Sequence, residues 1–477
     1  MIENFRKINF SLVVLGTVFL LSFVTDWYYQ LVIILMVTLV LTMLDNLGKG
    51  VVLREIIAMH ICFVCLVMPL IGYTFFSKAD RLARIFIKYM PVTIDVYFGY
   101  ALPAVSGFVL ALCWPIGTRN YSDKGQYVRQ VIDRGKLLLE RKPMVGTYLL
   151  IIGTVMFWVA KFLPPSVQFA FELLFFAAFA GFLYVFYQQK FKYRRVVLGF
   201  FTLFIVTIAL SSGIFTVIAY MSLTLFSFFF LGRKAKLWKK VLIFLIGVCV
   251  LVLIQSVKPA YRTLTWNKNY EGDKGMLFIT LIADKIQNPK FNSADDFFQI
   301  YIRANQGYNV ALVMRRFPKQ HPFDEGGNLA TSLAASIVPR FLWPDKPEAG
   351  GKFNMYYYAG MTIVGWSTNV GPLGEAYGSF GKDGAIFFMI LLGAFIRWAY
   401  KRVFSISRKV PLLIFWIPVL FYQVTYAAET DTLQILNSLF KSTFLVWILY
   451  RLAPQLFGME KRKNFIRRSP PGNPALN

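Results

Sequence analysis

Histidine, cysteine and charged residues are scarce in this sequence. Among 477 residues there are two histidines and four cysteines, and only 16% of the residues are charged. All four cysteines lie in strongly apolar segments, so no disulfide framework is expected. His60 stands near Cys62 and Cys65, but so apolar a setting favours the packing of soft side chains over metal binding. We therefore predict no metal site and no bound cofactor.

The familiar motifs of soluble enzymes are also missing. The sequence contains no phosphate-binding loop, no dinucleotide-binding glycine fingerprint, no zinc-binding His-Glu pattern and no nucleophile elbow. Any chemistry must therefore use a substrate that is already activated.

Hydrophobic residues are abundant instead. They make up 57% of the chain, and aromatic residues make up 17%. Together with repeated apolar stretches near the length that crosses a bilayer, this composition excludes an ordinary soluble domain. The sequence predicts a polytopic helical membrane protein.

Basic residues outnumber acidic ones, 51 to 24, for a formal net charge of +27. Much of the excess lies in short loops between apolar segments, which is the positive-inside pattern and also attracts anionic lipid headgroups. The charge therefore predicts topology and contact with a lipid bilayer. It does not predict binding of nucleic acid.

The predicted fold is an all-α integral membrane protein with about 12 transmembrane helices and one large, partly helical extracytoplasmic loop. The first apolar segment lacks a small-residue cleavage site and is interpreted as a retained span. The predicted spans are 10–25, 28–44, 55–76, 94–114, 144–163, 167–187, 196–212, 214–231, 241–257, 385–400, 411–427 and 433–452.

The predicted topology places both termini in the cytoplasm and divides the chain into four parts. These are a nine-span region at 1–257, the outer loop at 258–384, a three-span region at 385–452 and a basic tail at 453–477 that is expected to be disordered. The outer loop is the longest polar segment, and we expect the active site there. The basic loop 77–92 falls on the outer side, against the positive-inside pattern. The helical spacing of its apolar residues predicts an amphipathic helix at the membrane interface.

The outer loop contains two predicted helices. Ser293 is suited to cap a helix that continues to Arg316, and a second helix is expected at 329–338 before Pro339. Arg315 and Arg316 would meet the negative end of the first helix dipole, and this structural role is as well supported as binding a ligand.

Aromatic residues and glycines fill the end of the outer loop. Tyr356, Tyr357, Tyr358 and Trp366 could stack on sugar rings or mark the membrane interface, and both interpretations stay open. Glu375 follows in a glycine-rich stretch near the headgroup level, where a carboxylate could act as a base or orient a sugar hydroxyl.

Two short motifs in this region resemble those of Wzy-type O-antigen and oligosaccharide repeat-unit polymerases. The first runs from Pro339-Arg340 through Trp343-Pro344-Asp345-Lys346-Pro347, and the second is Gly374-Glu375-Ala376-Tyr377 with Phe380-Gly381. The motifs cover about residues 338–384, and the predicted span layout covers the rest.

The resemblance implies a membrane glycosyltransferase on the outer face of the bacterial plasma membrane. Its substrates would be oligosaccharides linked to undecaprenyl diphosphate. A sugar hydroxyl of one repeat unit would attack the anomeric carbon of another, and the lipid diphosphate would leave. A chain-length regulator and a flippase are the candidate protein partners, and no nucleic acid is implied.

The resemblance also nominates site residues. Guanidinium groups bind a diphosphate bidentately, so Arg340 is the first candidate for that role, and His321 or Glu375 would take the acceptor proton. Many members of that family carry an arginine between two mid-chain spans, but residues 211–214 read Ser-Ser-Gly-Ile here, which leaves open which arginine binds the diphosphate. The further substrate-binding candidates are Arg303, Arg315, Arg316, Lys346, Tyr357, Trp366 and Tyr377.

Two other functions compete with this prediction. An O-antigen-ligase-like transferase would join the glycan to a different acceptor. A transporter or flippase of lipid-linked oligosaccharides would place polar groups at mid-membrane, and few ionisable residues lie inside the predicted spans.

Overall fold

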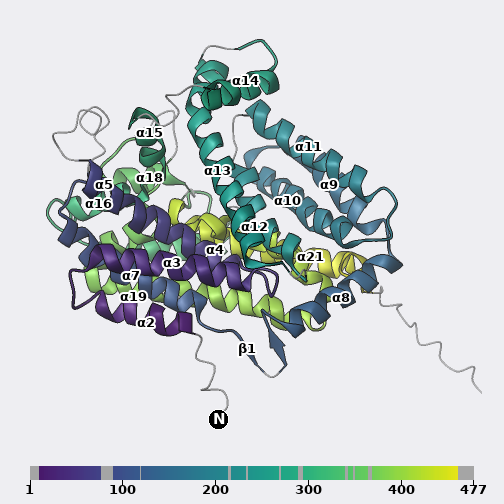
Figure 1. Ribbon diagram of the computed structural model, residues 1–477, viewed down its shortest axis with the longest axis horizontal. Helices are drawn as coiled ribbons and strands as arrows, with labels where there is room; N and C mark the ends of the chain where they lie inside the picture. Colours follow the sequence, from purple (N-terminus) through teal and green to yellow (C-terminus); the bar gives the residue numbers. More distant parts are fainter. Residues whose placement is uncertain are drawn as a thin grey trace, which may run out of the picture.

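The computed structural model is helical almost throughout. It describes residues 10–76, 90–118, 120–212, 216–232, 235–267, 270–287, 294–338, 342–347, 350–363 and 368–459. Within these ranges the strands are β1 (Gly117–Thr118) and β2 (Tyr121–Ser122), which pair as a short antiparallel hairpin. The all-α fold class is therefore confirmed (Figure 1).

Eight helical segments of the described chain are long and apolar enough to cross a membrane. A bent pair, α8 (Gln126–Arg141) and α9 (Val145–Ala160), would give a ninth if counted as one span. The eight are α3 (Tyr28–Asn46), Leu53–Phe75, α7 (Ile94–Cys113), α11 (Arg194–Ser212), Leu237–Trp266, α19 (Gly371–Ser407), Pro411–Glu429 and α21 (Thr432–Leu452).

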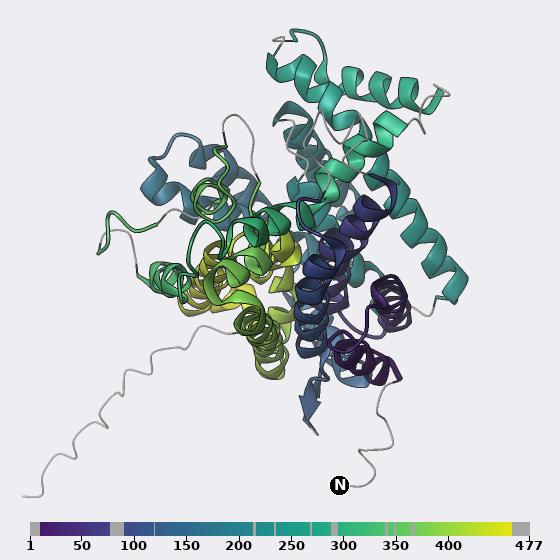
Figure 2. The same cartoon turned by 90° about the vertical axis from the view of Figure 1, so that its left-hand side faces the viewer.

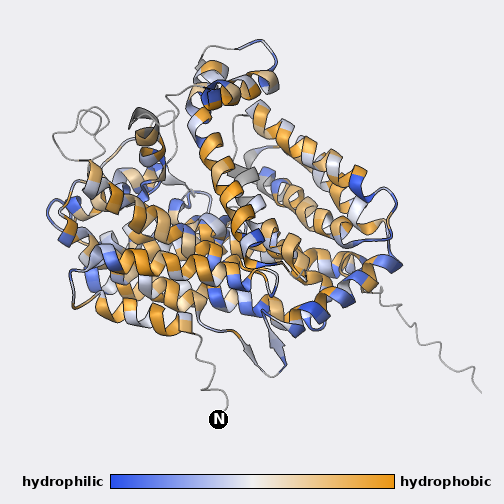
Figure 3. Cartoon of the chain, in the orientation of Figure 1, coloured by the Kyte–Doolittle hydropathy of each residue, from blue (hydrophilic) through white to orange (hydrophobic). Residues whose placement is uncertain are grey.

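The other four predicted spans correspond to α2 (Phe10–Leu21), α9, α10 (Pro165–Tyr187) and α12 (Thr216–Phe230). The structure thus shows a helical protein with eight or nine segments long and apolar enough to span a membrane, and the total of twelve remains a prediction. Figure 3 shows an apolar middle to the molecule, with hydrophilic residues on α14 (Lys274–Gln287) at the top and on α8 at the lower right.

Two helix pairs make the most extensive contacts, α7 with α19 and α9 with α10. A Cβ added at Gly393 would come within 2.5 Å of the Phe108 carbonyl oxygen, and one at Gly153 within 2.6 Å of the Ala178 Cβ. Small residues at these contacts let the helix backbones approach closely, as is usual in membrane bundles.

Several spans contain irregular backbone. Leu53–Phe75 consists of α4 (Leu53–Cys62), the π-turn η1 (Phe63–Val67) and α5 (Met68–Phe75). Pro411–Glu429 contains two 3-10 segments, η4 (Pro411–Trp416) and η5 (Gln423–Glu429), joined through α20 (Ile417–Leu420). This second segment is almost wholly buried, and irregular backbone is tolerated at membrane depth where protein covers it.

The region predicted as an outer loop is partly core. The single helix expected up to Arg316 is two helices, α15 (Ala294–Ala304) and α16 (Gln306–Arg316), and that prediction was wrong. Asn305 interrupts the helix because its side chain accepts a hydrogen bond from the Tyr308 backbone nitrogen and caps α16. Most of α16 is buried, and it packs against α19.

The boundaries of this region also differ from the prediction. Helix α13 (Leu237–Arg262) extends beyond the expected end at 257, and α19 begins at Gly371 instead of 385. Gly381 kinks α19 with φ 68° and ψ −165°, a backbone conformation that favours glycine. The second expected helix is confirmed as α17 (Gly327–Ile337), and α18 (Gly351–Tyr357) follows it.

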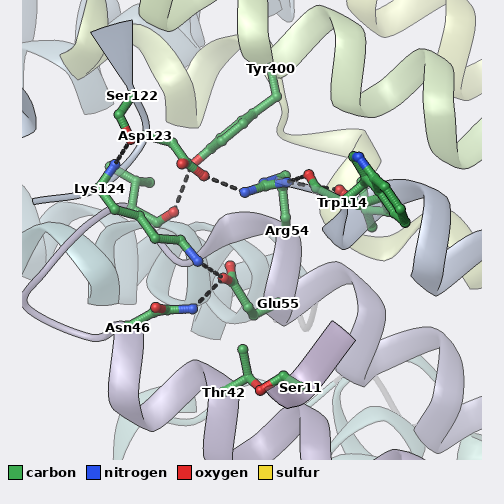
Figure 4. Close-up of polar contacts among 12 residues, drawn as sticks. Ser11, Thr42, Asn46, Arg54, Glu55, Trp114, Ser122, Asp123, Lys124 and Tyr400 are labelled. Atoms are coloured by element: carbon green, nitrogen blue, oxygen red, sulfur yellow. Dashed lines mark hydrogen bonds and ion pairs between the residues drawn. The ribbon is translucent and has the colours of Figure 1, made fainter. Parts of the chain in front are cut away.

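A buried ion pair joins three segments at the end of the molecule away from α14 and α15 (Figure 4). Arg54 donates to Asp123 and to the carbonyl oxygens of Leu112 and Trp114, and its guanidinium lies over the Tyr400 ring. Its side chain is 2% exposed. These contacts fix the start of α4 to the hairpin and to α19, so we assign the network a structural role.

Several predictions lie outside the described residues. They are Arg340, Trp366, most of the expected amphipathic helix at 77–92 and nearly all of the basic tail.

Candidate functional site

A cavity of about 630 Å³ lies where α17, α18, the start of α19 and the start of α21 meet. Figure 2 shows the green segments of this region beside the yellow helix α21. The lining is mixed in polarity and contains three carboxyl groups, one lysine and two aromatic rings. It is formed by Asn328, Leu329, Thr331, Ser332, Asp345, Pro347, Gly350, Gly351, Lys352, Phe353, Asn354, Tyr358, Ile363, Thr368, Glu375, Asp431 and Leu433.

Glu375 is the predicted site residue that the structure places in this cavity. It lies early in α19, and only 3% of its surface is exposed. Its Oε2 accepts hydrogen bonds from the backbone nitrogen (2.8 Å) and the hydroxyl of Thr432, and its Oε1 accepts one from the Asn354 amide. A carboxylate has about four acceptor sites, so these three bonds leave room for a substrate hydroxyl.

Asp431 is a second buried carboxyl group that sequence analysis missed. It caps α21 by accepting a hydrogen bond from the Gln434 nitrogen, and it also accepts from the Gly350 nitrogen (2.8 Å) and the Asn369 amide (3.0 Å). Burial raises the pKa of the Asp431 carboxyl, although these three donors favour its charged form. The sequence does contain a signal for this helix cap. Asp431 is followed three residues later by Gln434, directly before an apolar run, a pattern typical of a helix start.

Two asparagine amides link these carboxyl groups. Asn354 donates to Glu375 and lies 3.4 Å from the Asn369 side-chain oxygen, while Asn369 donates to Asp431. The Asn369 carbonyl in turn accepts hydrogen bonds from Gln306 (2.6 Å) and Asn309 (2.9 Å) of α16. Four segments of the chain therefore hold the two carboxyl groups in a fixed arrangement.

Three cations gather near this site on α13 and α15. Lys258 is 6% exposed and is close enough to Arg262, Arg303 and Glu429 for their charges to act on it. Among the described residues no carboxylate lies within ion-pair distance of Lys258. We call Lys258, Arg262 and Arg303 the cation cluster.

The cation cluster and the cavity are connected through the end of η5. Glu429 Oε1 lies 3.1 Å from His60 Nε2, and Glu429 is two residues before Asp431 in the chain. The cation cluster thus lies near the turn that begins α21, and Asp431 of that turn lines the cavity.

The other predicted site residues that the structure describes line no part of the cavity. The ammonium group of Lys346 donates to the carbonyl oxygens of Ala335 and Val338 at the end of α17, so it caps a helix, and its substrate binding stays a prediction from the sequence. Tyr377 is partly buried and contacts the rings of Tyr100 and Phe323, and its substrate binding likewise stays a prediction.

Tyr357 and His321 belong to a group of aromatic side chains beside the cavity. Tyr357 stacks on Phe353, whose ring is 5.6 Å away and lines the cavity, and its other side meets His321. Arg316 lies against Gly360, and Arg315 is exposed. His321 does not line the cavity.

No group of three or more metal-binding side chains is found in the part of the chain that the structure describes.

The chain belongs to a protein family described as a domain of unknown function, DUF8712, whose profile matches residues 116–450. The matched region includes the cavity, the cation cluster and the last three predicted spans. No curated protein and no solved structure matches the chain.

Proposed function

We propose that this protein is a membrane glycosyltransferase that polymerises oligosaccharide repeat units carried on undecaprenyl diphosphate. The product would be a surface polysaccharide, built on the outer face of the bacterial plasma membrane with both termini in the cytoplasm. The observation that supports this proposal is the pairing of a carboxyl-lined cavity with the cation cluster near the turn at Glu429–Asp431. The two motifs that resemble Wzy-type polymerases lie in the same region.

The cavity suits the acceptor sugar. Its volume of about 630 Å³ lies within the usual range of ligand pockets, and Asn328, Thr331 and Ser332 offer neutral donors and acceptors for hydroxyl groups. Phe353 provides an aromatic face that is half exposed. Sugars are recognised by this combination of hydrogen bonds and ring stacking.

Glu375 is the proposed general base. It would take the proton of an acceptor hydroxyl while the hydroxyl oxygen forms a bond to the anomeric carbon of the donor. Asn354 and Thr432 hold the carboxylate in place, which limits its motion before the reaction. Asp431 lines the same cavity, and two negative charges there repel each other, which favours proton transfer to one of the two carboxylates.

The cation cluster is proposed to receive the leaving group. As the bond between the anomeric carbon and the phosphate oxygen breaks, its electron pair stays on the diphosphate, which gains negative charge. Two guanidinium groups and a buried ammonium would stabilise that charge. This assigns the diphosphate to Arg303 and Arg262 with Lys258, while Arg340 stays a prediction from the sequence.

Analysis of lipid-linked glycans in a deletion strain tests the proposal. Accumulation of single repeat units on the carrier, cured by the wild-type gene, is the expected result. Full-length chains retained on the carrier would instead identify a ligase, and units trapped on the inner face would identify a flippase.

A further inference from the structure

A second groove lies at the opposite end of the molecule, between the end of α8 and the segment that follows α10. Its volume is about 280 Å³, and its walls include Glu140, Pro143, Gln188, Lys190 and Lys192. None of these residues takes part in the proposed transferase site. The groove is therefore an independent feature of the fold.

Gln188 at the end of α10 has an unpaired carbonyl oxygen. The side chain is 2% exposed, and its amide nitrogen donates to the backbone oxygens of Leu139 (3.1 Å) and Lys142 (3.4 Å). Its Oε1 is buried and accepts no hydrogen bond from any described residue. A buried acceptor without a donor is unfavourable, so a ligand that brings a hydroxyl or N–H group would stabilise this wall of the groove.

The charge of the groove favours an anion. Lys190 and Lys192 supply two positive charges, and Glu140 offsets one of them through a 2.9 Å contact with Lys190. The Lys190 side chain is 80% exposed and can reach other groups, and the adjoining Arg141 and Lys142 add further positive charge. The ligand should therefore carry a negative group as well as a hydrogen-bond donor.

The position of the groove indicates a membrane lipid. Helix α8 turns by 86° relative to α9, so α8 lies along the membrane surface if α9 runs across the bilayer (Figure 1). Exposed apolar side chains at helical spacing, including Met144, Tyr148 and Val155, begin beside Pro143 and continue along α9. Acyl chains could follow this stripe while the headgroup occupies the groove.

The geometry points to a specific binding site for an anionic glycerophospholipid whose headgroup carries hydroxyl groups, such as phosphatidylglycerol. The phosphate contacts Lys190 and Lys192, and a headgroup hydroxyl donates to Gln188 Oε1. This site does not depend on the proposed transferase activity.

Native mass spectrometry of the full-length protein with added lipids tests the inference. The probes are dioleoyl phosphatidylglycerol, dioleoyl phosphatidylmethanol, which has the same charge without hydroxyl groups, and dioleoyl phosphatidylcholine. We expect retention to decrease in that order. A comparison of lipids tests the hydrogen bond to Gln188 Oε1 without any substitution in the protein. The contacts that the Gln188 amide nitrogen makes with the protein therefore stay intact.

The lysines are tested by a double variant, Lys190→Gln with Lys192→Gln. Phosphatidylglycerol retention should fall about fivefold for each lysine, while a matched double variant at the same end, Lys401→Gln with Arg402→Gln, should behave as the wild type. Equal retention of phosphatidylglycerol and phosphatidylcholine by the wild type, or equal losses in the two double variants, would overturn the site. Equal retention of phosphatidylglycerol and phosphatidylmethanol would overturn the role of Gln188.

Inorganic phosphate separates a lipid headgroup from a free anion. We expect millimolar phosphate to leave lipid retention unchanged. If phosphate displaces phosphatidylglycerol from the wild type but not from the lysine double variant, the groove binds a free anion and the assignment to a lipid is wrong.

Discussion

Glu375 accepts a hydrogen bond of 2.8 Å from the backbone nitrogen of Thr432. This bond joins the start of α19 to the start of α21, two helices that begin 61 residues apart, at 371 and 432. The first nitrogens of a helix have no partner within the helix, and a carboxylate satisfies them well. The same contact therefore anchors two helices and holds the proposed base in the cavity.

Replacing Glu375 by Gln should remove the proposed base while keeping nearly the same shape. We expect polymer formation to fall by a factor of about 10²–10⁴, the usual contribution of general base catalysis. The measurement is polymer rate and length at matched membrane abundance. Asp383→Asn, at an exposed position of the same helix, is the control and should be silent. Normal polymer from a well-expressed Glu375→Gln variant would remove this residue from the reaction.

Replacing Asp431 by Ala should destabilise the fold. The variant loses the cap of α21, worth about 1 kcal/mol, and also leaves the Gly350 nitrogen and the Asn369 amide without their acceptor. Thermal unfolding in detergent measures the loss. Asp45→Ala serves as the control, because Asp45 forms a surface pair with Lys49 and such pairs contribute about 0–1 kcal/mol. Equal effects of the two changes would contradict the buried role of Asp431.

The stability of the protein should depend on pH through Asp431. Because burial raises the pKa of this carboxyl, the folded protein holds the proton more tightly than the unfolded chain does. The stabilisation that comes from this tighter proton binding is fully present below the ordinary aspartate pKa of about 3.9. It is lost as pH rises through the raised pKa of Asp431 in the folded protein. The stability of the wild type relative to Asp431→Asn should therefore decrease as pH rises from about 4. If the difference in stability between the wild type and Asp431→Asn does not change with pH, the raised pKa of Asp431 is contradicted.

Replacing Lys258 by Met should raise stability and lower activity together. The change removes a buried cation that lies near two guanidinium groups, and we expect a gain of about 1–3 kcal/mol. Polymer formation should fall because the leaving diphosphate loses one of its three cations. Thermal unfolding and polymer rate are measured on the same preparation. Lys239→Met on the same helix, where the lysine is exposed, should change neither. A stabilised Lys258→Met variant with normal polymer would separate the cation cluster from the reaction.

Reporter fusions at Lys240 and Asn328 test the topology. The basic segment before Leu237–Trp266 predicts that Lys240 is cytoplasmic, and Asn328 lines the cavity that we place outside. The two reporters should therefore give opposite signals. The same signal from both would require another orientation and would move the cavity to the cytoplasmic side.

The sequence by itself determined the helical class, the order of the apolar segments and several helix ends. Hydropathy and helix-stop signals are local properties of the chain, so α17 was predicted to within two residues at its start from its neighbours alone. Glu375 was also nominated from its sequence context. The break at Asn305 was missed because its side chain competes with the helix for a backbone nitrogen, and a continuous apolar stripe hides that competition.

Only the tertiary structure decided which polar groups work together. Asp431, Asn354 and Asn369 join Glu375 through hydrogen bonds between segments far apart in the chain, and no periodicity records such contacts. Packing also gave Lys346 a helix to cap and placed Tyr377 against Tyr100, although both stand in motifs that indicated a substrate. A side chain's function depends on which groups surround it, and in this bundle those groups are set by how distant helices pack.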